Sequence, residues 1–385
     1  MHWNGPSVPW VRMPESDPSA TLRRGTAAEA GLDEARLEVA WHLLERWAQD
    51  GSVPGSAIVV ARRGVLLESR AFGVAAHGDQ QQSMAHDSLF LVASVTKPVT
   101  AIAVLQLVER GLLSLADPVH AHIPEFTGVI QGLDRDRIRV EHLLTHTSGL
   151  PDMLPQNEAL RARHAPLADF VKDVCRCELL FAAGTQVSYQ SMGTLLAGEI
   201  VERITGQPLR QVMADHIFAP LAMASTSLGI RADLASRAAD VVLPQEQIGT
   251  DYHWNTSYWQ CLGAPWGGMF STVDDLTRLL WATLSGGVLQ DGRVLGTLTN
   301  RVMISDRTTR MSGLASEHRP QCWGLGWRLG AWGDLASAES FSHGGATGTL
   351  VGADPESGLA CAIFTTRPGA PLHRVATAVQ AAVIN

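Results

Sequence analysis

The sequence predicts an α/β (α+β) fold, with a mainly antiparallel sheet flanked by helices and an all-helical domain inserted between the halves of the sheet. Strand-like runs occur near both ends of the 385-residue chain, within residues 56–72 and 323–366. The middle of the chain instead holds helical segments separated by loops that contain Pro, Gly and Asn. We therefore expect the two ends to share one sheet and the middle segment to be an insertion.

The first elements follow from composition and spacing. Residues 1–28 are rich in Pro, Ser and Gly and are expected to form an irregular arm. An amphipathic helix is predicted over residues 33–50, where apolar side chains recur at helical spacing. Residues 56–62 and 65–72 are β-rich and flank Arg63-Gly64, which predicts a hairpin.

The later elements complete the predicted domains. Helices are expected at residues 167–174, 193–204 and 208–218, strands at 323–329, 349–353 and 359–366, and a last helix at 372–383. The domains are then an arm at 1–28, a discontinuous sheet domain at 29–111 and 261–385, and a helical domain at 112–260. We expect the active site at the junction of the two larger domains, where clefts usually form.

Composition excludes several classes of function. The net charge is -8 and no basic run is longer than two arginines, so neither nucleic acid nor an anionic membrane is an expected partner. The N-terminus lacks a basic segment followed by an apolar run, and no apolar stretch approaches the length of a membrane span, which predicts a cytoplasmic protein. Five scattered cysteines suit a reducing compartment. A small-molecule ester or amide is the expected partner.

The first candidate for chemistry is Ser94-Val95-Thr96-Lys97, because Lys97 is one of only two lysines. An apolar helix is predicted from here to Gly111, with Ser94 at a position typical of an N-terminal cap. Residues three apart on a helix share a face, so the two side chains are within reach of each other. A Ser hydroxyl is a weak nucleophile until a base takes its proton, and a neutral Lys amine in a dry pocket is such a base.

Two further segments carry candidate residues. Tyr189 immediately precedes a predicted helix, where its ring can project into a cleft and its hydroxyl can pass a proton to a leaving group. Ser342-His343-Gly344-Gly345-Ala346 lies among the returning strands. Its glycines permit close approach of a ligand to the backbone, whose N–H groups are good oxyanion donors. Taken singly, a core tyrosine and a plain glycine turn remain alternative interpretations.

These three segments, in this order, resemble the serine β-lactamase-like hydrolase superfamily, in the branch that holds class C β-lactamases, D,D-peptidases, D-aminopeptidases and β-lactamase-like esterases. The resemblance covers roughly residues 30–385 and includes the stretches 143–151 and 267–276. It implies a β-lactamase/transpeptidase-like fold without metal or cofactor. Ser94 is then the acylated nucleophile, Lys97 and Tyr189 the proton-transfer pair, and the backbone N–H groups of Ser94 and Ala346 the oxyanion hole.

Two departures from the family pattern bear on the substrate. Tyr189-Gln190-Ser191 replaces Tyr-x-Asn, so the amide that would grip an acylamino side chain is missing. His343-Gly344-Gly345 replaces Lys-Thr-Gly. The permanently charged lysine of the family pattern is thus replaced by a histidine, which is charged only at lower pH. We therefore expect hydrolysis of a small carboxylic ester, with Ser191, His343, Gly344 and Gly345 at the substrate. A D-amino-acid peptidase or amidase, a weak β-lactamase and a non-catalytic binding protein remain alternatives.

Other motifs are weaker. Trp254, Tyr258 and Trp266 belong to an aromatic-rich segment that either lines the substrate pocket or fills the seam between domains. His142 and His146 lack the His-Glu-x-x-His order of zinc proteases, so no metal site is predicted. The sequence specifies neither the physiological substrate, acyl length and stereochemistry nor the oligomeric state.

Overall fold

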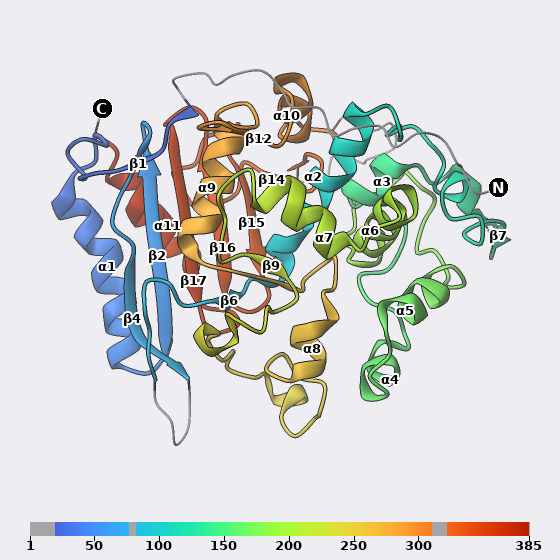
Figure 1. Cartoon of the computed structure of the whole chain (residues 1–385), viewed down its shortest axis with the longest axis horizontal. Helices are drawn as coiled ribbons and strands as arrows, with labels where there is room; N and C mark the ends of the chain where they lie inside the picture. Colours follow the sequence, from blue (N-terminus) through green and yellow to red (C-terminus); the bar gives the residue numbers. More distant parts are fainter. Residues whose placement is uncertain (1–19, 77–81, 310–321, 385) are drawn as a thin grey trace.

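The computed structural model describes residues 20–76, 82–309 and 322–384 (Figure 1). Within these residues the main sheet has ten strands, in the order β1-β3-β2-β17-β16-β15-β14-β13, with β4 paired to β2 and β5 to β4. The strands are β1 (Arg23–Arg24), β2 (Gly55–Arg62), β3 (Val65–Leu66), β4 (Arg70–Ala76), β5 (Gln82–Ser83), β13 (Cys322–Trp323), β14 (Arg328–Leu329), β15 (Phe341–Gly345), β16 (Thr349–Asp354) and β17 (Leu359–Thr365). Every pairing is antiparallel except that of β1 with β3, so the predicted fold class is confirmed.

The two ends of the chain meet in the centre of this sheet. Strand β17 pairs with β2 over seven residues, from Leu359 opposite Arg62 to Thr365 opposite Ser56. The hairpin at Arg63-Gly64 is also confirmed, because both residues have positive φ, as a tight turn between twisted strands requires. The second predicted run of the hairpin is divided into β3 and β4, which pair with opposite ends of β2.

The expected N-terminal arm needs one correction. Its residues 1–19 lie outside the described residues, but Arg23 and Arg24 form β1, parallel to β3 at the edge of the sheet. The end of the arm is therefore not irregular, because the unpaired edge of β3 offers it backbone partners.

Helices cover both faces of the sheet. On one face, α1 (Glu34–Gln49) packs beside α11 (Leu372–Ala381), and on the other lies α9 (Val273–Leu284) (Figure 1). Strand β17 shows the alternation that this arrangement demands: Ala362 and Phe364 belong to the core on the α9 side, whereas Cys361 and Ile363 belong to the core under α1 and α11.

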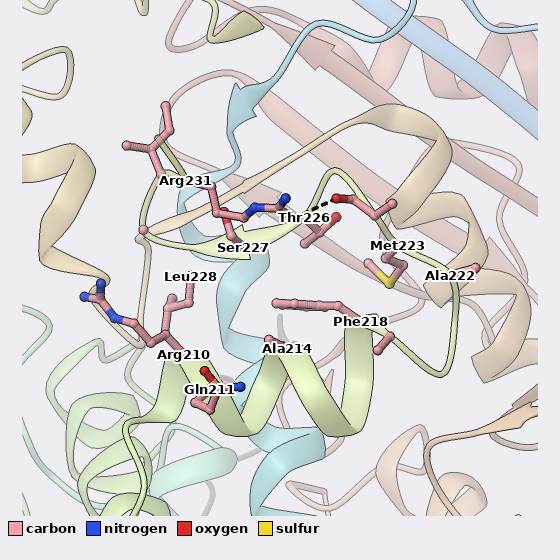
Figure 2. A pocket seen from close by; sticks show the side chains of 14 residues that line it. Arg210, Gln211, Ala214, Phe218, Ala222, Met223, Thr226, Ser227, Leu228 and Arg231 are labelled. Carbon is pink, nitrogen blue, oxygen red and sulfur yellow. Dashed lines mark hydrogen bonds between the residues drawn. The ribbon is translucent and has the colours of Figure 1, made fainter. Parts of the chain in front are cut away.

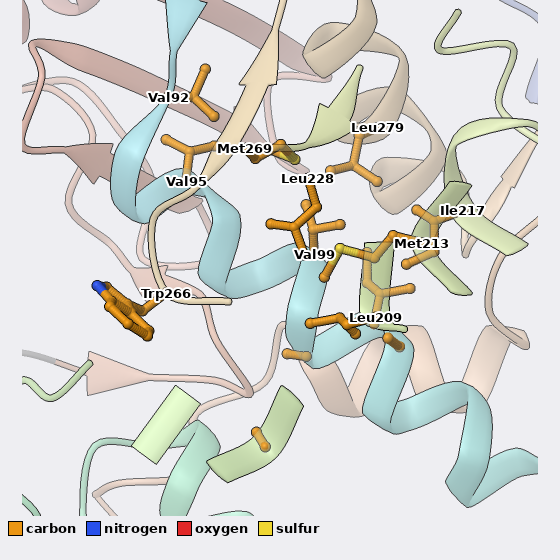
Figure 3. Close-up of a cluster of buried hydrophobic side chains, with 14 of the residues drawn as sticks. Val92, Val95, Val99, Leu209, Met213, Ile217, Leu228, Trp266, Met269 and Leu279 are labelled. Atoms are coloured by element: carbon orange, nitrogen blue, oxygen red, sulfur yellow. The ribbon is translucent and has the colours of Figure 1, made fainter. Parts of the chain in front are cut away.

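The nucleophile segment leads into α2 (Thr96–Glu109), which is buried over most of its length. A single 3₁₀ turn, Ala93–Val95, precedes it, so Ser94 is not the N-terminal cap of the helix as predicted. Gly111, with φ of 67°, ends the helix as expected. Val95 and Val99 pack among apolar side chains from later segments of the chain, namely Leu209, Met213, Ile217, Leu228 and Met269 (Figure 3).

Between residues 112 and 260 the described chain is rich in helices. The α-helices are α3 (Val140–Leu144), α4 (Asn157–Ala162), α5 (Leu167–Val174), α6 (Met192–Thr205), α7 (Leu209–Met213) and α8 (Ser257–Leu262). They are joined by the π-helical turn η5 (Ala214–Phe218) and by the 3₁₀ turns η3 (Val119–Ala121), η4 (Arg135–Arg137), η6 (Ala235–Arg237) and η7 (Gln245–Gln247). The same region holds the short strands β7 (Val129–Ile130), β8 (Leu133–Asp134) and β9 (Ser227–Leu228). Strand β9 pairs with β10 (Met269–Ser271), which pairs with β6 (Phe90–Leu91), so a small sheet joins this region to both flanking segments.

The predicted domain boundaries remain a prediction. None of the described helices combines the length and the hydrophobicity that a membrane crossing needs.

Candidate active site

Ser94 lies in a turn that is anchored to the small sheet. Ala93 has φ of 46°, in the left-handed region that a non-glycine residue adopts only under local constraint. Thr96 supplies part of that constraint: its Oγ1 donates to the carbonyl oxygen of Ala93 at 2.6 Å and accepts from the N–H of Met269 at 3.1 Å. The N–H of Val92 also donates to the oxygen of Met269 at 2.9 Å. The position of Ser94 is therefore fixed relative to β10.

Lys97 is buried next to Ser94, as the spacing predicts. Its Nζ donates to Ser94 Oγ at 3.0 Å and to the carbonyl oxygen of Trp266 at 3.1 Å. Burial lowers the pKa of Lys97 to about 7, against a smaller opposing effect of the Asp152 charge. A large fraction of the amine is thus neutral near pH 7 and able to accept the proton of Ser94.

Tyr189 completes a group of three side chains. The centre of its ring lies 4.6 Å from Lys97 Nζ, and the nearby Ser94 hydroxyl lowers the pKa of the phenol, against the larger opposite effect of burial. Burial raises the pKa of Tyr189 well above its ordinary value, so the phenol keeps its proton at neutral pH. The structure therefore brings together the three residues predicted to be catalytic, with a neutral phenol beside the nucleophile.

The backbone on each side of Tyr189 is held by the segment that begins at His146. The N–H of Ser188 donates to the oxygen of His146 at 2.9 Å, and the N–H of Gln190 donates to His146 Nδ1 at 3.1 Å. The side chain of Gln190 is turned to the same segment, where Nε2 donates to the oxygen of His142 and Oε1 accepts from Ser148 Oγ. Gln190 therefore fixes the backbone and is not a substrate ligand.

His146 is the main residue of the site that was not predicted from the sequence, where it was rejected as a metal ligand and otherwise stood only within the matched stretch 143–151. Its φ is 60°, its ring centre lies 4.6 Å from that of Tyr189 and 4.3 Å from that of Trp323, and it is buried. Burial, and then the nearby Lys97, hold the pKa of His146 well below its usual range. Since Nδ1 accepts a hydrogen bond, the ring is a neutral Nε2–H tautomer that supports Tyr189. The described residues contain no cluster of three or more His, Cys, Asp or Glu suited to a metal ion.

The hairpin between β15 and β16 is tied to the chain just before Ser94. Thr349 Oγ1 donates to the oxygen of Val92 at 3.0 Å, and Thr347 Oγ1 donates to that of Leu91. Gly345 faces the same segment so closely that a Cβ there would lie 2.3 Å from the oxygen of Val92. These contacts hold the hairpin that carries the exposed Ala346 against the chain segment that precedes Ser94.

His343 is buried in β15 beside Tyr189 and Trp323, at ring distances of 6.1 and 5.8 Å. Its Nδ1 lies 2.7 Å from the oxygen of Gly344, which makes Nδ1 the protonated nitrogen. Burial, and then Lys97, lower the pKa of His343 to about 3. His343 is consequently uncharged over the whole neutral range and cannot replace the permanent cation of the family pattern.

Ser191 is turned toward an acidic residue. Its Oγ donates to Asp152 Oδ1 at 2.6 Å, and its N–H donates to the Asp152 backbone oxygen at 3.3 Å. Asp152 is exposed, and its charge raises the pKa of both Lys97 and Tyr189. Asp152 was not predicted as a site residue, because it lies 39 positions from Ser191 and outside the motifs that contain the candidate catalytic residues.

The predicted aromatic ligands are only partly brought to this site. The carbonyl oxygen of Trp266 accepts from Lys97, but its indole packs against Phe170 at a ring distance of 5.9 Å. Tyr258 stacks on His164 at 4.6 Å, and its hydroxyl donates to the oxygen of Ala165 at 2.9 Å. Among the described residues, no hydrogen bond or ring contact joins Tyr258 or the half-buried Trp254 to Ser94, Lys97 or Tyr189.

A separate pocket of about 500 Å³ lies between the helical segment α7–η5 and strand β9 (Figure 2). The residues that line it include Phe218, Leu228 and Arg231, and none of the predicted site residues is among them. The pocket is nevertheless close to the turn that carries Ser94. Its lining residue Leu228 pairs with Met269 of β10, and the N–H of Met269 donates to Thr96 in that turn.

Comparison with known proteins adds the family context. The family model described as Beta-lactamase matches residues 34–384. Esterase EstB of Burkholderia gladioli is 30% identical over 342 residues, covering 81% of this chain and 83% of its own. A putative D-alanyl-D-alanine carboxypeptidase of Salmonella enteritidis is 26% identical over 387 residues, covering 89% and 85%. The crystal structure of a penicillin-binding protein homologue from Caulobacter crescentus superposes with a TM-score of 0.75 at 23% identity, over 91% of this chain and 99% of that one.

Proposed function

Since the chain belongs to the Beta-lactamase family and is a serine hydrolase, we propose that it cleaves small carboxylic esters through an acyl-enzyme on Ser94. One observation carries this proposal: a buried amine with a pKa of about 7 lies 3.0 Å from the Ser94 hydroxyl. A base is most effective when its pKa is close to the working pH, because it is then both available and basic enough.

The reaction follows from the positions of three groups. Ser94 Oγ attacks the ester carbonyl carbon while its proton passes to Lys97 Nζ, and the carbonyl oxygen becomes an oxyanion. The N–H groups of Ser94 and Ala346 stabilise that negative charge. The bond to the leaving oxygen then breaks, and this oxygen takes a proton from Tyr189, which regains one from Lys97. Water then takes the place of Ser94 as the nucleophile and attacks the acyl carbon. Ser94 Oγ becomes the leaving oxygen that is protonated, and the carboxylic acid is released.

The charges around the site favour an ester over a substrate with a free carboxylate. His343 is neutral, and the carboxylate of Asp152 is held beside Ser191. A carboxylate anchored beside Ser191 would meet the negative charge of Asp152 and a partly neutral Lys97, whereas the Arg328 guanidinium acts on the site from the side of His343. The relation to Esterase EstB supports the same conclusion.

A D-amino-acid peptidase is the second candidate, because several relatives are named putative D-alanyl-D-alanine carboxypeptidases. The same acyl-enzyme chemistry would serve an amide, with more demand on Tyr189, because an amine leaving group has to be protonated.

Hydrolysis of p-nitrophenyl butyrate tests the proposal. The purified protein and the variants Ser94→Ala and Ser83→Ala are compared, Ser83 being an exposed serine of β5. We expect the wild type and Ser83→Ala to turn over, and intact-protein mass spectrometry of rapidly quenched samples to find one butyryl group on each. Ser94→Ala should show neither. Equal turnover in Ser94→Ala excludes Ser94 as nucleophile. No turnover of this ester by the wild type, combined with cleavage of D-alanyl dipeptides, selects the peptidase.

A further inference from the structure

Asp152 places an exposed carboxylate beside the catalytic group. Ser191 holds it with two hydrogen bonds, one from Oγ to Oδ1 at 2.6 Å and one from N–H to the backbone oxygen at 3.3 Å. Ser191 is only two residues from Tyr189, whose ring contacts Lys97. The carboxylate is therefore fixed near the reacting atoms, although its surface remains open to solvent.

Most of the other ionisable groups of the site are uncharged near neutral pH, and the exception is the Arg328 guanidinium, whose charge acts on His343. His146 and His343 are both buried in the neutral form, and Lys97 is half neutral near pH 7. No arginine or lysine in the described part of the chain forms an ion pair with Asp152. The field of Asp152 nevertheless reaches the centre of the site, because it acts on both Lys97 and Tyr189. Above pH 7 Lys97 loses most of its positive charge, and the Asp152 carboxylate remains without a directly paired cation in the described part of the site.

We propose that Asp152 is a specificity determinant, which makes the enzyme prefer esters that carry a positively charged group over neutral esters of the same shape and over anionic esters. This inference rests on the proposed function and names its substrate class: an ester with an ammonium group a few ångströms from the scissile bond. Opposite unit charges roughly 7 Å apart in a partly solvated site change the rate constant by about tenfold, and salt screens the effect.

A charge series of three p-nitrophenyl esters tests it. The cationic ester is p-nitrophenyl 4-(trimethylammonio)butyrate, and the neutral ester of the same shape is p-nitrophenyl 5,5-dimethylhexanoate. The anionic ester is p-nitrophenyl hydrogen adipate. The trimethylammonium group has no N–H, so the comparison isolates charge from hydrogen bonding. kcat/KM is measured at pH 8 for the wild type, Asp152→Asn and Glu68→Gln, at low and high ionic strength. Glu68 is an exposed carboxylate between β3 and β4, so its variant changes the net charge equally at a distant place.

For the wild type and Glu68→Gln we expect the cationic ester to be cleaved about ten times faster than the neutral ester at low salt, and the anionic ester to be slowest. In Asp152→Asn the ratio of cationic to neutral should fall close to one, and high salt should reduce the ratio in the other two proteins. A wild-type ratio near one, or a ratio that Asp152→Asn leaves unchanged, overturns the inference. Equal loss on all three esters in Asp152→Asn also overturns it, since Asp152 then acts by positioning Ser191. These outcomes are distinguishable from failure of the proposed function, in which the wild type cleaves none of the three esters or Ser94→Ala retains turnover.

Discussion

The amine of Lys97 donates to the hydroxyl of Ser94 at 3.0 Å and to the carbonyl oxygen of Trp266 at 3.1 Å, and no carboxylate is bonded to it among the described residues. Both partners are uncharged, so nothing in direct contact offsets the cost of burying an ammonium ion. This arrangement explains why the pKa of Lys97 falls to about 7. It also leaves part of the amine neutral near pH 7, as the proposed role of Lys97 as a base requires.

Replacing Lys97 with Met is the first test of that role. We expect Lys97→Met to lower kcat/KM for p-nitrophenyl butyrate by about 10³-fold, in the range typical of a lost general base. The fold should persist with an equal or higher melting temperature, because a buried ionisable group is replaced by an apolar side chain of similar length. Steady-state kinetics and thermal unfolding measure the two effects.

The second lysine of the chain supplies the control. Lys172 is exposed on α5, so Lys172→Met removes the same charge without touching the site and should keep wild-type kinetics. Lys97→Arg is expected to be as inactive as Lys97→Met, since a guanidinium does not give up its proton. Full acylation by Lys97→Arg would contradict the assignment.

The pH profile is the second prediction. Lys97 acts when neutral, so kcat/KM should rise with pH and reach half its maximum near pH 7, the pKa of Lys97. His146 and His343 stay neutral over this range, because burial lowers the pKa of each. Burial raises the pKa of Tyr189, so no alkaline fall is expected below about pH 10.

The acid limb of this profile also depends on Asp152. Its negative charge raises the pKa of Lys97, so Asp152→Asn should move the limb to lower pH. The profiles are recorded as kcat/KM between pH 5 and 10 in buffers of constant ionic strength. A limb that moves to higher pH in Asp152→Asn, or a wild-type rate that does not vary between pH 6 and 8, contradicts this account.

Local spacing was sufficient to predict several features of the fold and site. The spacing of three residues between Ser94 and Lys97 predicted that their side chains are close together. The strand-like runs at both ends of the chain predicted that they share one sheet, in which β2 pairs with β17. Each of these depends on periodicity, which a single sequence displays. Tyr189 was a candidate from its place before a predicted helix, but only the family resemblance assigned it to the proton-transfer pair, since an isolated tyrosine before a helix has no distinctive pattern.

The features that could not be predicted depend on contacts between distant segments. The bond between Asp152 and Ser191 spans 39 positions, and the bond of His146 to the backbone of Gln190 spans 44. His146 also has a positive φ, which could not be predicted because the residue is neither Gly nor Asn, the types that usually adopt this conformation. The aromatic segment shows the converse: Tyr258 is close to Trp266 in sequence, yet its ring is stacked on His164.

Thr96 provides the third prediction, which concerns the turn that carries Ser94. Thr96→Val keeps the shape of the side chain but removes the hydroxyl that links Ala93 to Met269. We expect a loss of about 1–3 kcal/mol in the free energy of unfolding, since the N–H of Met269 loses its partner. kcat should also fall, because the left-handed Ala93 loses a restraint. Urea denaturation and steady-state kinetics measure these changes.

Thr100→Val is the matched control, one helical turn further along α2. Its hydroxyl donates to the carbonyl oxygen of Pro265 at 2.7 Å and to that of Thr96 at 3.3 Å, and neither bond involves Ala93 or Met269. A similar loss of stability with nearly unchanged kcat is expected there. Equal losses of kcat in both variants would show that general stability, and not the turn, limits activity.

The glycines of β15 give the fourth prediction, because two neighbours differ sharply in the space around them. A Cβ on Gly345 would lie 2.2 Å from Thr349 Oγ1 and 2.3 Å from the oxygen of Val92, whereas the nearest atom to a Cβ on Gly344 is 3.7 Å away. Gly345→Ala should therefore push the hairpin away from the chain before Ser94. The melting temperature should fall by several degrees, as expected for about 1–3 kcal/mol of overpacking, and Gly344→Ala should melt like the wild type.

The kinetic consequence of Gly345→Ala separates positioning of the oxyanion donor from binding of the substrate. The hairpin carries Ala346, so its displacement should lower kcat by about 10²-fold while KM changes little, because the donor acts most strongly on the charge that develops in the transition state. Thr349→Ala, made in the Gly345→Ala background, removes the nearer of the two obstructing oxygens but leaves the oxygen of Val92 in place. Partial recovery of kcat in the double variant is the expected result. A Gly345→Ala variant with wild-type kcat, or with its whole effect on KM, would show that this hairpin does not place the oxyanion donor.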